Sequence, residues 1–125
     1  MNNFELFIGY LGNGATVCNK AVQENGNYKT VAHISTAGNI KLYVKDDYIP
    51  QDSMKKIKIT AQSHREQTIK RLDRELSTDY GYGRILDECC DYTPYECWHQ
   101  LLNDLNGKEI EERKKLIKNY YVTYF

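Results

Sequence analysis

The first 45 residues carry short runs of alternating apolar and polar residues, separated by turn signals built from glycine and asparagine. Over residues 40–45, apolar side chains take every second position, as in a strand with one buried face. Asn-Gly pairs supply the positive φ angles that tight hairpins need. The pattern therefore predicts four strands joined by three turns. The strands are expected at residues 4–11, 15–22, 28–35 and 40–45, and the turns at residues 12–14, 25–27 and 38–39.

After Pro50 the spacing of apolar residues changes from two to three or four, which predicts a long amphipathic helix over residues 51–76. Proline suits a helix start because its missing N–H is not needed there, and Asp52 complements the positive end of the helix dipole. The stripe expected to be buried consists of Met54, Ile57, Ala61, His64, Thr68, Leu72 and Leu76.

Glycines and capping residues divide the remainder of the chain. The Tyr-Gly-Tyr-Gly run at residues 80–83 is predicted to form a turn, and a short helix is expected over residues 84–90. Thr93 as N-cap, Pro94 in the first helical position and Glu96 as the second half of a capping box predict the start of a further helix.

Gly107 is expected to end that helix, because glycine readily adopts the left-handed conformation found after a helix C-terminus. A last helix is expected from Lys108 onward. The predicted fold class is α+β: a four-stranded antiparallel β-meander followed by three or four α-helices packed on one face. The chain is expected to be a single domain over residues 1–125. Its expected parts are the β-meander at 1–48, the long helix at 50–76 and a tyrosine-rich helical part at 84–125.

Charge is balanced in total, with 17 basic and 17 acidic side chains, but it is segregated along the chain. Residues 50–76 carry a net charge of +3, residues 77–106 of −5, and residues 107–125 of +2. A general nucleic-acid binder should show a clear basic excess, and a DNA mimic a clear acidic one. The segments either neutralise each other in the fold or form a two-signed surface that steers one partner.

Tyrosine is the composition's strongest departure from the average, with 11 residues, seven of them in the last 46. Aromatic side chains concentrate at protein contact surfaces. The aromatic C-terminus therefore either docks on its own fold or contacts another chain, as a homodimer or with a foreign protein. The residues expected to bind a partner are the anchors Tyr92, Tyr95, Trp98 and Tyr121 and the acidic Asp87, Glu88 and Asp91, which would face a basic groove.

Catalytic and metal-binding patterns are weak. The cysteines include no CxxC pair, and no local feature marks one of them as an activated nucleophile. An enzyme is therefore the least favoured class, and no catalytic residue, metal ligand or cofactor site is expected. The cysteines are expected to be reduced thiols in a cytoplasmic protein; they are Cys18, Cys89, Cys90 and Cys97.

Nucleic-acid or nucleotide binding is the alternative function. The basic residues of the helix over 55–74, together with stacking tyrosines, would contact phosphates and bases. Arg65, Lys70 and Arg71 are the candidate contacts. Interleaved acidic residues such as Glu66 also allow this face to be an ordinary solvated helix surface. No apolar stretch approaches the ~18 residues of a membrane helix, so a membrane partner is not expected.

Two stretches of the N-terminal half resemble small accessory proteins of phages and mobile elements of Gram-positive gut bacteria. They are FIGYLGNGATVCNKAV at residues 7–22 and the run from Glu24 to Val44, which includes Ala32-His33-Ile34-Ser35 and Gly38-Asn39-Ile40-Lys41-Leu42. The resemblance implies an inhibitor of a host defence system, as in anti-CRISPR proteins, acting in the host cytosol. Its partner would be a host protein such as a CRISPR–Cas effector, and no catalytic motif is implied.

Overall fold

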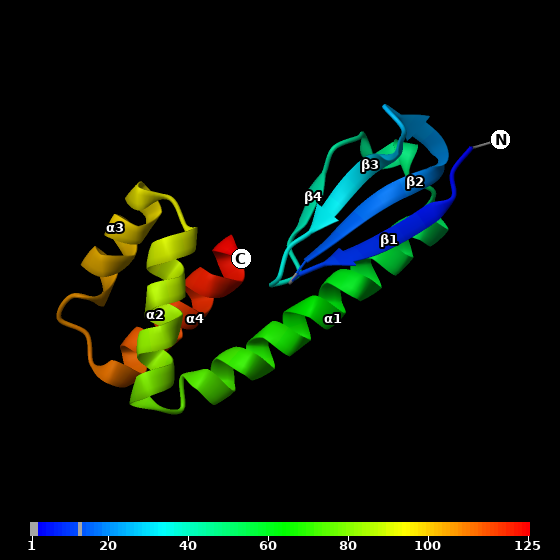
Figure 1. Cartoon of the computed structure of the whole chain (residues 1–125). Helices are drawn as coiled ribbons and strands as arrows, with labels where there is room; N and C mark the ends of the chain where they lie inside the picture. The colour runs from blue at the N-terminus through cyan, green and yellow to red at the C-terminus, as the bar shows by residue number, and fades with distance from the viewer. Residues whose placement is uncertain (1–2, 13) are drawn as a thin grey trace. The chain divides into compact units, whose positions relative to one another are not determined.

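The computed structural model describes residues 3–12 and 14–125, and it has the α+β architecture that the sequence predicts (Figure 1). Four strands precede one 3₁₀ turn and four α-helices. The strands are β1 (Leu6–Leu11), β2 (Gly14–Glu24), β3 (Asn27–Ile34) and β4 (Ile40–Leu42). The helices are η1 (Asp46–Tyr48), α1 (Gln51–Glu75), α2 (Asp79–Tyr92), α3 (Tyr95–Leu105) and α4 (Ile110–Tyr124).

The chain divides into two compact units, and α1 passes from one to the other. The sheet unit comprises Met1–Arg65, and the helical unit comprises Glu66–Phe125. Each unit has a hydrophobic cluster of its own. The expectation that the whole chain behaves as one domain stays a prediction.

The sheet unit is an antiparallel meander in the order β1-β2-β3-β4, as predicted. The β2–β3 hairpin turns at Asn25 and Gly26, which have φ angles of 52° and 82°. Both central residues of a type I′ turn need positive φ, so this Asn-Gly pair produces the hairpin that its sequence indicates. Register shifts after Val17 and after Asn19 show that β2 is irregular along its length.

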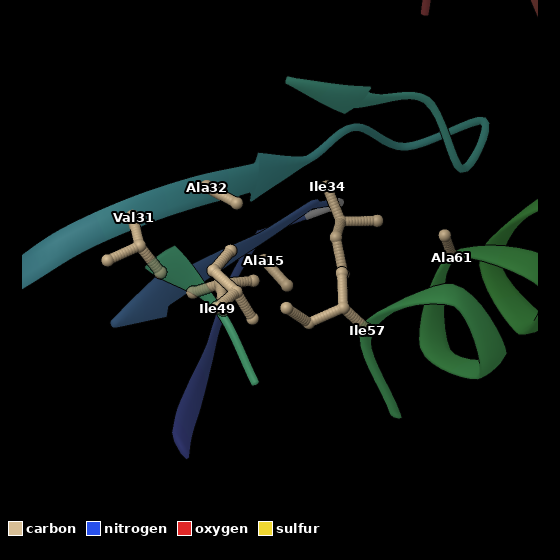
Figure 2. Packing of buried hydrophobic residues seen from close by; sticks show 8 residues of the cluster. Ala15, Val31, Ala32, Ile34, Ile49, Ile57 and Ala61 are labelled. Carbon is tan, nitrogen blue, oxygen red and sulfur yellow. The ribbon is translucent and has the colours of Figure 1, made fainter. Parts of the chain in front are cut away.

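The first half of α1 covers one face of this sheet. Ile57 and Ala61 of α1 pack with Ala15 of β2 and Ile34 of β3 in a buried cluster (Figure 2). Leu6 and Ile8 of β1 and Ile40 and Leu42 of β4 pack at its edges. Among the described residues, α1 is the only α-helix that contributes to this cluster, so the stripe predicted for residues 54–61 does face the sheet.

The helical unit has a second cluster, formed by α2, α3 and α4 with the last turns of α1. Its buried members are Leu72, Leu76, Ile85, Cys89, Leu101, Leu105, Ile117 and Tyr121. The helices after α1 thus share a core with its end rather than adding side chains to the cluster beneath the sheet.

The predicted turn at residues 80–83 is wrong, because these residues form the first turns of α2. Thr78 is the N-cap, and its hydroxyl accepts a hydrogen bond of 3.0 Å from the backbone N–H of Gly81. A β-carbon at Gly81 would overlap the carbonyl oxygen of Glu75. Glycine therefore marks a close crossing of two backbones here, not a break in the helix.

The predicted capping box at residues 93–96 is also wrong. The N-cap of α3 is Pro94 rather than Thr93, and no side-chain hydrogen bond caps this helix. Thr93 instead follows the end of α2, where its hydroxyl contacts the carbonyl oxygen of Cys89. Gly107 has a φ of 77° shortly after the end of α3, which confirms its predicted role.

Candidate protein-interaction surface

Two tyrosines project from the junction of α2 and α3. Tyr92 is the last residue of α2 and is 75% exposed, while Tyr95 is the first residue of α3 and is 71% exposed. The ring of Tyr95 lies against the ring of His99, one helical turn further on, with 5.0 Å between their centroids. Large exposed aromatic side chains at adjacent positions are typical of a contact surface.

The junction that carries these tyrosines is held by hydrogen bonds. The Thr93 hydroxyl lies 2.5 Å from the carbonyl oxygen of Cys89 and 2.5 Å from the hydroxyl of Tyr120 on α4. Pro94, the residue that follows Thr93, has its own φ angle fixed by its ring. Because the residues between Tyr92 and Tyr95 are fixed, the two rings are presented from a defined backbone, which lowers the conformational cost of binding.

Exposed acidic side chains occur on the same two helices as the tyrosines. Asp87 and Asp91 are one helical turn apart on α2, Glu96 is in the first turn of α3, and all three are exposed. None of the ion pairs within the described part of the chain involves these three carboxylates. We name the group Tyr92, Tyr95, His99, Asp87, Asp91 and Glu96 the acidic tyrosine surface. Its charge complements a basic partner.

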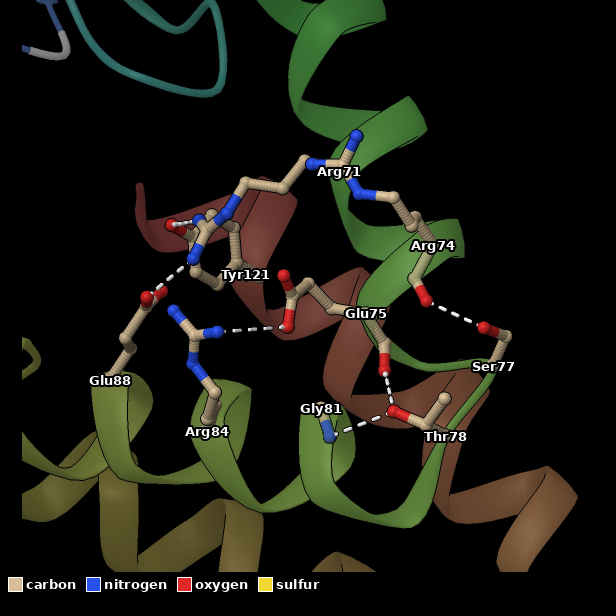
Figure 3. Close-up of polar contacts among 9 residues, drawn as sticks. All are labelled: Arg71, Arg74, Glu75, Ser77, Thr78, Gly81, Arg84, Glu88 and Tyr121. Carbon is tan, nitrogen blue, oxygen red and sulfur yellow. Dashed lines mark hydrogen bonds and ion pairs between the residues drawn. The ribbon is translucent and has the colours of Figure 1, made fainter.

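Glu88 and Tyr121 do not belong to this surface, which corrects the expected set of contacts (Figure 3). Tyr121 is only 3% exposed, and its ring stacks on that of Phe125 with 4.0 Å between centroids. Arg71 on α1 donates one hydrogen bond of 2.9 Å to the Tyr121 hydroxyl and another of 2.5 Å to Glu88 Oε1. Residues expected to bind two different partners therefore bind each other inside the helical unit.

The electrostatics of this triad favour a charged Arg71 guanidinium and a neutral Tyr121 hydroxyl. The hydrogen bond to Glu88 raises the pKa of the Arg71 guanidinium, which stays charged. Burial raises the pKa of the Tyr121 hydroxyl, which stays neutral and accepts the hydrogen bond from Arg71. Arg71 of α1 pairs with the half-buried carboxylate of Glu88 on α2 and donates to Tyr121 on α4. The triad therefore joins these three helices.

Trp98 is half-buried and packs against the hydrophobic cluster of the helical unit. It supports α3 beneath Tyr95 rather than standing free in solvent. The aromatic C-terminus is divided in the same way: Tyr121 and Phe125 pack inward, whereas Tyr124 remains 50% exposed. Part of the aromatic C-terminus therefore docks on its own helical unit. The homodimer stays a prediction.

Two of the three cations considered for nucleic-acid contacts have structural partners. In the sheet unit, Arg65 donates 2.8 Å and 2.6 Å hydrogen bonds to the carbonyl oxygen of Ala37 and to Asn39 Oδ1, which hold the β3–β4 loop on α1. Arg71 is held in the triad described above. Lys70 is exposed. The basic helix is therefore not the continuous phosphate-binding track that the alternative function requires.

Two observations bear on metal binding and on the reactivity of Cys89. They contain no group of three or more His, Cys, Asp or Glu side chains placed to hold a metal ion. Burial raises the pKa of the Cys89 thiol to about 12, which makes it a poor nucleophile. No helix within residues 3–12 and 14–125 is long and apolar enough to cross a membrane.

The search of known proteins found no match to this chain among protein-family models, curated proteins or solved structures.

Sequence reasoning overlooked His99 and Glu96 as members of the surface. The four-residue spacing of Tyr95 and His99 places them on one face of α3 and was the available signal. It also overlooked Tyr80, which is 78% exposed and lies 5.9 Å from the guanidinium of Arg84. No signal in the sequence indicated this pair, because a turn at residues 80–83 does not place Tyr80 and Arg84 on one helix face.

Proposed function

We propose that this protein is a non-enzymatic protein-binding module whose contact site is the acidic tyrosine surface. The observation that carries the proposal is the pair Tyr92 and Tyr95, each more than 70% exposed on a junction fixed by Thr93. Rigid, exposed tyrosines supply a large contact area at little entropic cost, and such residues dominate the energetics of many interfaces.

The acidic side chains define the chemistry of the partner. Asp87, Asp91 and Glu96 are exposed on the two helices that carry the tyrosines and form no ion pairs to described basic side chains. A partner with a basic groove would satisfy these carboxylates and would be steered toward them. Enzymes that handle nucleic acid carry such grooves, which supports the narrower proposal of an inhibitor of a host defence nuclease of the CRISPR–Cas type. The resemblance of the N-terminal half to phage and mobile-element proteins supports the same context.

The test is an affinity capture from bacterial lysate, with and without nuclease treatment, followed by mass spectrometry. We expect one protein to be recovered in both samples. Tyr95→Ala should abolish its capture while changing the thermal midpoint little, because the ring is largely exposed. Tyr43→Ala in the sheet unit is the matched control, since Tyr43 is also exposed, at 52%, and lies outside the proposed surface. It should leave capture intact.

Recovery of the partner only without nuclease treatment would contradict the proposal and would favour nucleic acid as the bridging ligand. In that case, affinity should fall steeply with salt, and the triple charge reversal of Arg65, Lys70 and Arg71 should remove it. Equal loss of capture in Tyr95→Ala and Tyr43→Ala would also contradict it, because the contact would then not be confined to the helical unit.

A further inference from the structure

Within the described residues of the sheet unit, α1 packs on one face of the meander and no other helix of this unit packs on the opposite face. The residues that point away from α1 follow from the strand register: Gly9 pairs with Thr16, Thr16 with His33, and His33 with Lys41. None of these four belongs to the cluster beneath the sheet. They form a row across all four strands, roughly 14 Å wide at the usual spacing between strands.

Three aromatic residues lie on one side of this row, toward the Cys18–Thr30 pair. Phe7 on β1 is 42% exposed, and its ring meets that of Tyr28 on β3 edge-on, with 5.6 Å between centroids. Tyr43, directly after β4, is 52% exposed, and the ammonium of Lys41 lies 5.5 Å from its ring centroid. Phe7, Tyr28 and Tyr43 are all absent from the cluster beneath the sheet, which places them on the open face.

The outward strand positions beside the rings carry short side chains. Gly9 has no side chain, and Thr16 and Thr30 are short hydroxyl residues. No acidic residue occurs at the outward strand positions fixed by this register, whereas Lys41 supplies a cation. These positions are Phe7, Gly9, Leu11, Gly14, Thr16, Cys18, Gln23, Tyr28, Thr30, His33 and Lys41.

We propose that this open sheet face, with Phe7, Tyr28 and Tyr43 as stacking platforms and Lys41 as a phosphate contact, binds a short single-stranded nucleic acid. Exposed rings on a sheet can stack two or three successive bases, and stacking tolerates any base because each has a π-face. The positive charge complements the phosphates. Single strands fit better than duplexes, since the faces of paired bases are not available to the rings.

A protein partner is the less favoured occupant of this face. Protein contacts of this kind prefer a contiguous apolar patch. Here Cys18 and Thr30 lie between Phe7 and Tyr43, and the charged Lys41 lies against the Tyr43 ring. The site is also independent of the acidic tyrosine surface, because it lies in the other unit, so either proposal can fail without the other.

The test is fluorescence anisotropy with a labelled 12-nucleotide thymidine oligomer, at two salt concentrations, with a duplex of the same length as the second ligand. Tyr43→Ala should weaken binding of the single strand about tenfold, the usual effect of removing one stacking ring. Lys41→Glu should weaken it as well and reduce its dependence on salt. Tyr80→Ala, at an exposed tyrosine of the helical unit outside both proposed sites, is the control and should leave binding unchanged.

Phe7→Leu provides a second variant that removes a ring but retains an apolar side chain beside Gly9, where the Phe7 ring now packs. Thermal midpoints of all variants show that the sheet remains folded. The proposal is overturned if the wild-type protein does not bind the single strand, or if the duplex binds as tightly. It is also overturned if neither Tyr43→Ala nor Phe7→Leu weakens binding, or if Tyr80→Ala weakens it as much.

Discussion

The side chain of Asn19 on β2 donates a hydrogen bond of 3.1 Å to the hydroxyl of Tyr48 in η1. Asn19 is fully buried, and its amide makes three further hydrogen bonds. Oδ1 accepts from the backbone N–H groups of Glu5 and Ala21, at 3.0 Å each, and Nδ2 donates to the carbonyl oxygen of Asn3. One side chain thus joins the segment before β1, the irregular part of β2 and η1.

Replacing Asn19 should therefore destabilise the sheet unit strongly. Asn19→Leu has a similar volume but leaves the backbone N–H groups of Glu5 and Ala21, which form part-buried hydrogen bonds, without their acceptor. We expect a loss of about 2–4 kcal/mol in urea unfolding followed by circular dichroism, with faster amide hydrogen exchange at both residues. Tyr48→Phe, which removes one of the four bonds, should cost about 1 kcal/mol. Equal losses in the two variants would show that the network does not act through Asn19.

Neighbouring carboxylates on α2 should respond differently to neutralisation. Glu88→Gln weakens the ion pair with Arg71, and we expect a loss of about 1 kcal/mol, a modest value because both side chains are partly exposed. Asp91→Asn should change stability by less than about 0.5 kcal/mol and should instead weaken capture of the protein partner. Urea unfolding monitored by Trp98, the single tryptophan, reports on the helical unit that contains both residues. The reverse pattern would place Glu88, not Asp91, at the contact surface.

The two glycines at the start of α2 offer a matched pair of substitutions. Gly81→Ala should destabilise the helical unit by more than about 3 kcal/mol, because its β-carbon would overlap the backbone of Glu75 and force α2 away from α1. At Gly83 a β-carbon meets no atom within 4 Å. Gly83→Ala should therefore stabilise the unit by roughly 0.5–1 kcal/mol, because alanine favours the helix. Thermal unfolding measures both effects, and similar results for the two variants would disprove the close crossing.

Alkaline pH should weaken the helical unit through Cys89. Burial raises the pKa of this thiol from 9.0 to about 12, so between these values the unfolded chain releases a proton that the folded chain keeps. The contribution is complete below pH 9 and is lost as pH rises toward 12. In Cys89→Ala this loss is absent, so the wild-type advantage in unfolding free energy should shrink above pH 9 by up to about 1.4 kcal/mol per pH unit. A difference that stays constant from pH 8 to pH 10.5 would contradict the assignment.

Thiol labelling offers an independent check on the cysteines. Cys89 is fully buried, whereas Cys90 is exposed on the next position of α2. We expect a maleimide reagent at neutral pH to modify Cys90 rapidly and Cys89 only on unfolding. Equal labelling rates in the folded protein would show that the helical cluster opens on the timescale of the reaction.

Much of the local structure could be predicted from the chain because its causes are local. The Asn25–Gly26 turn, the alternation in β4 and the three- and four-residue spacing of α1 depend on neighbouring residues, and the structure confirms each of them. Thr68 and Leu72 are buried as the stripe predicts. The alternation also determined which face of the meander would need α1.

The segments that were predicted wrongly share one physical cause. Their residue types are determined by contacts with residues that are distant in sequence. Gly81 is needed because α2 crosses the end of α1, and Thr93 contacts Tyr120 on α4, 27 residues later. Local capping and turn rules cannot anticipate such contacts, since the competing partner is not near in sequence.

The sequence by itself determined which elements form, the balance of charge and the supply of tyrosines. Only the tertiary structure decided what each tyrosine does. Tyr121 is buried against Arg71, while Tyr92 and Tyr95 extend into solvent, although all three are tyrosines on amphipathic helices. A tyrosine has an apolar ring and a polar hydroxyl, so its free energy is favourable in either place. The packing of the helices around Arg71 and Thr93, not the residue type, selects between core and surface.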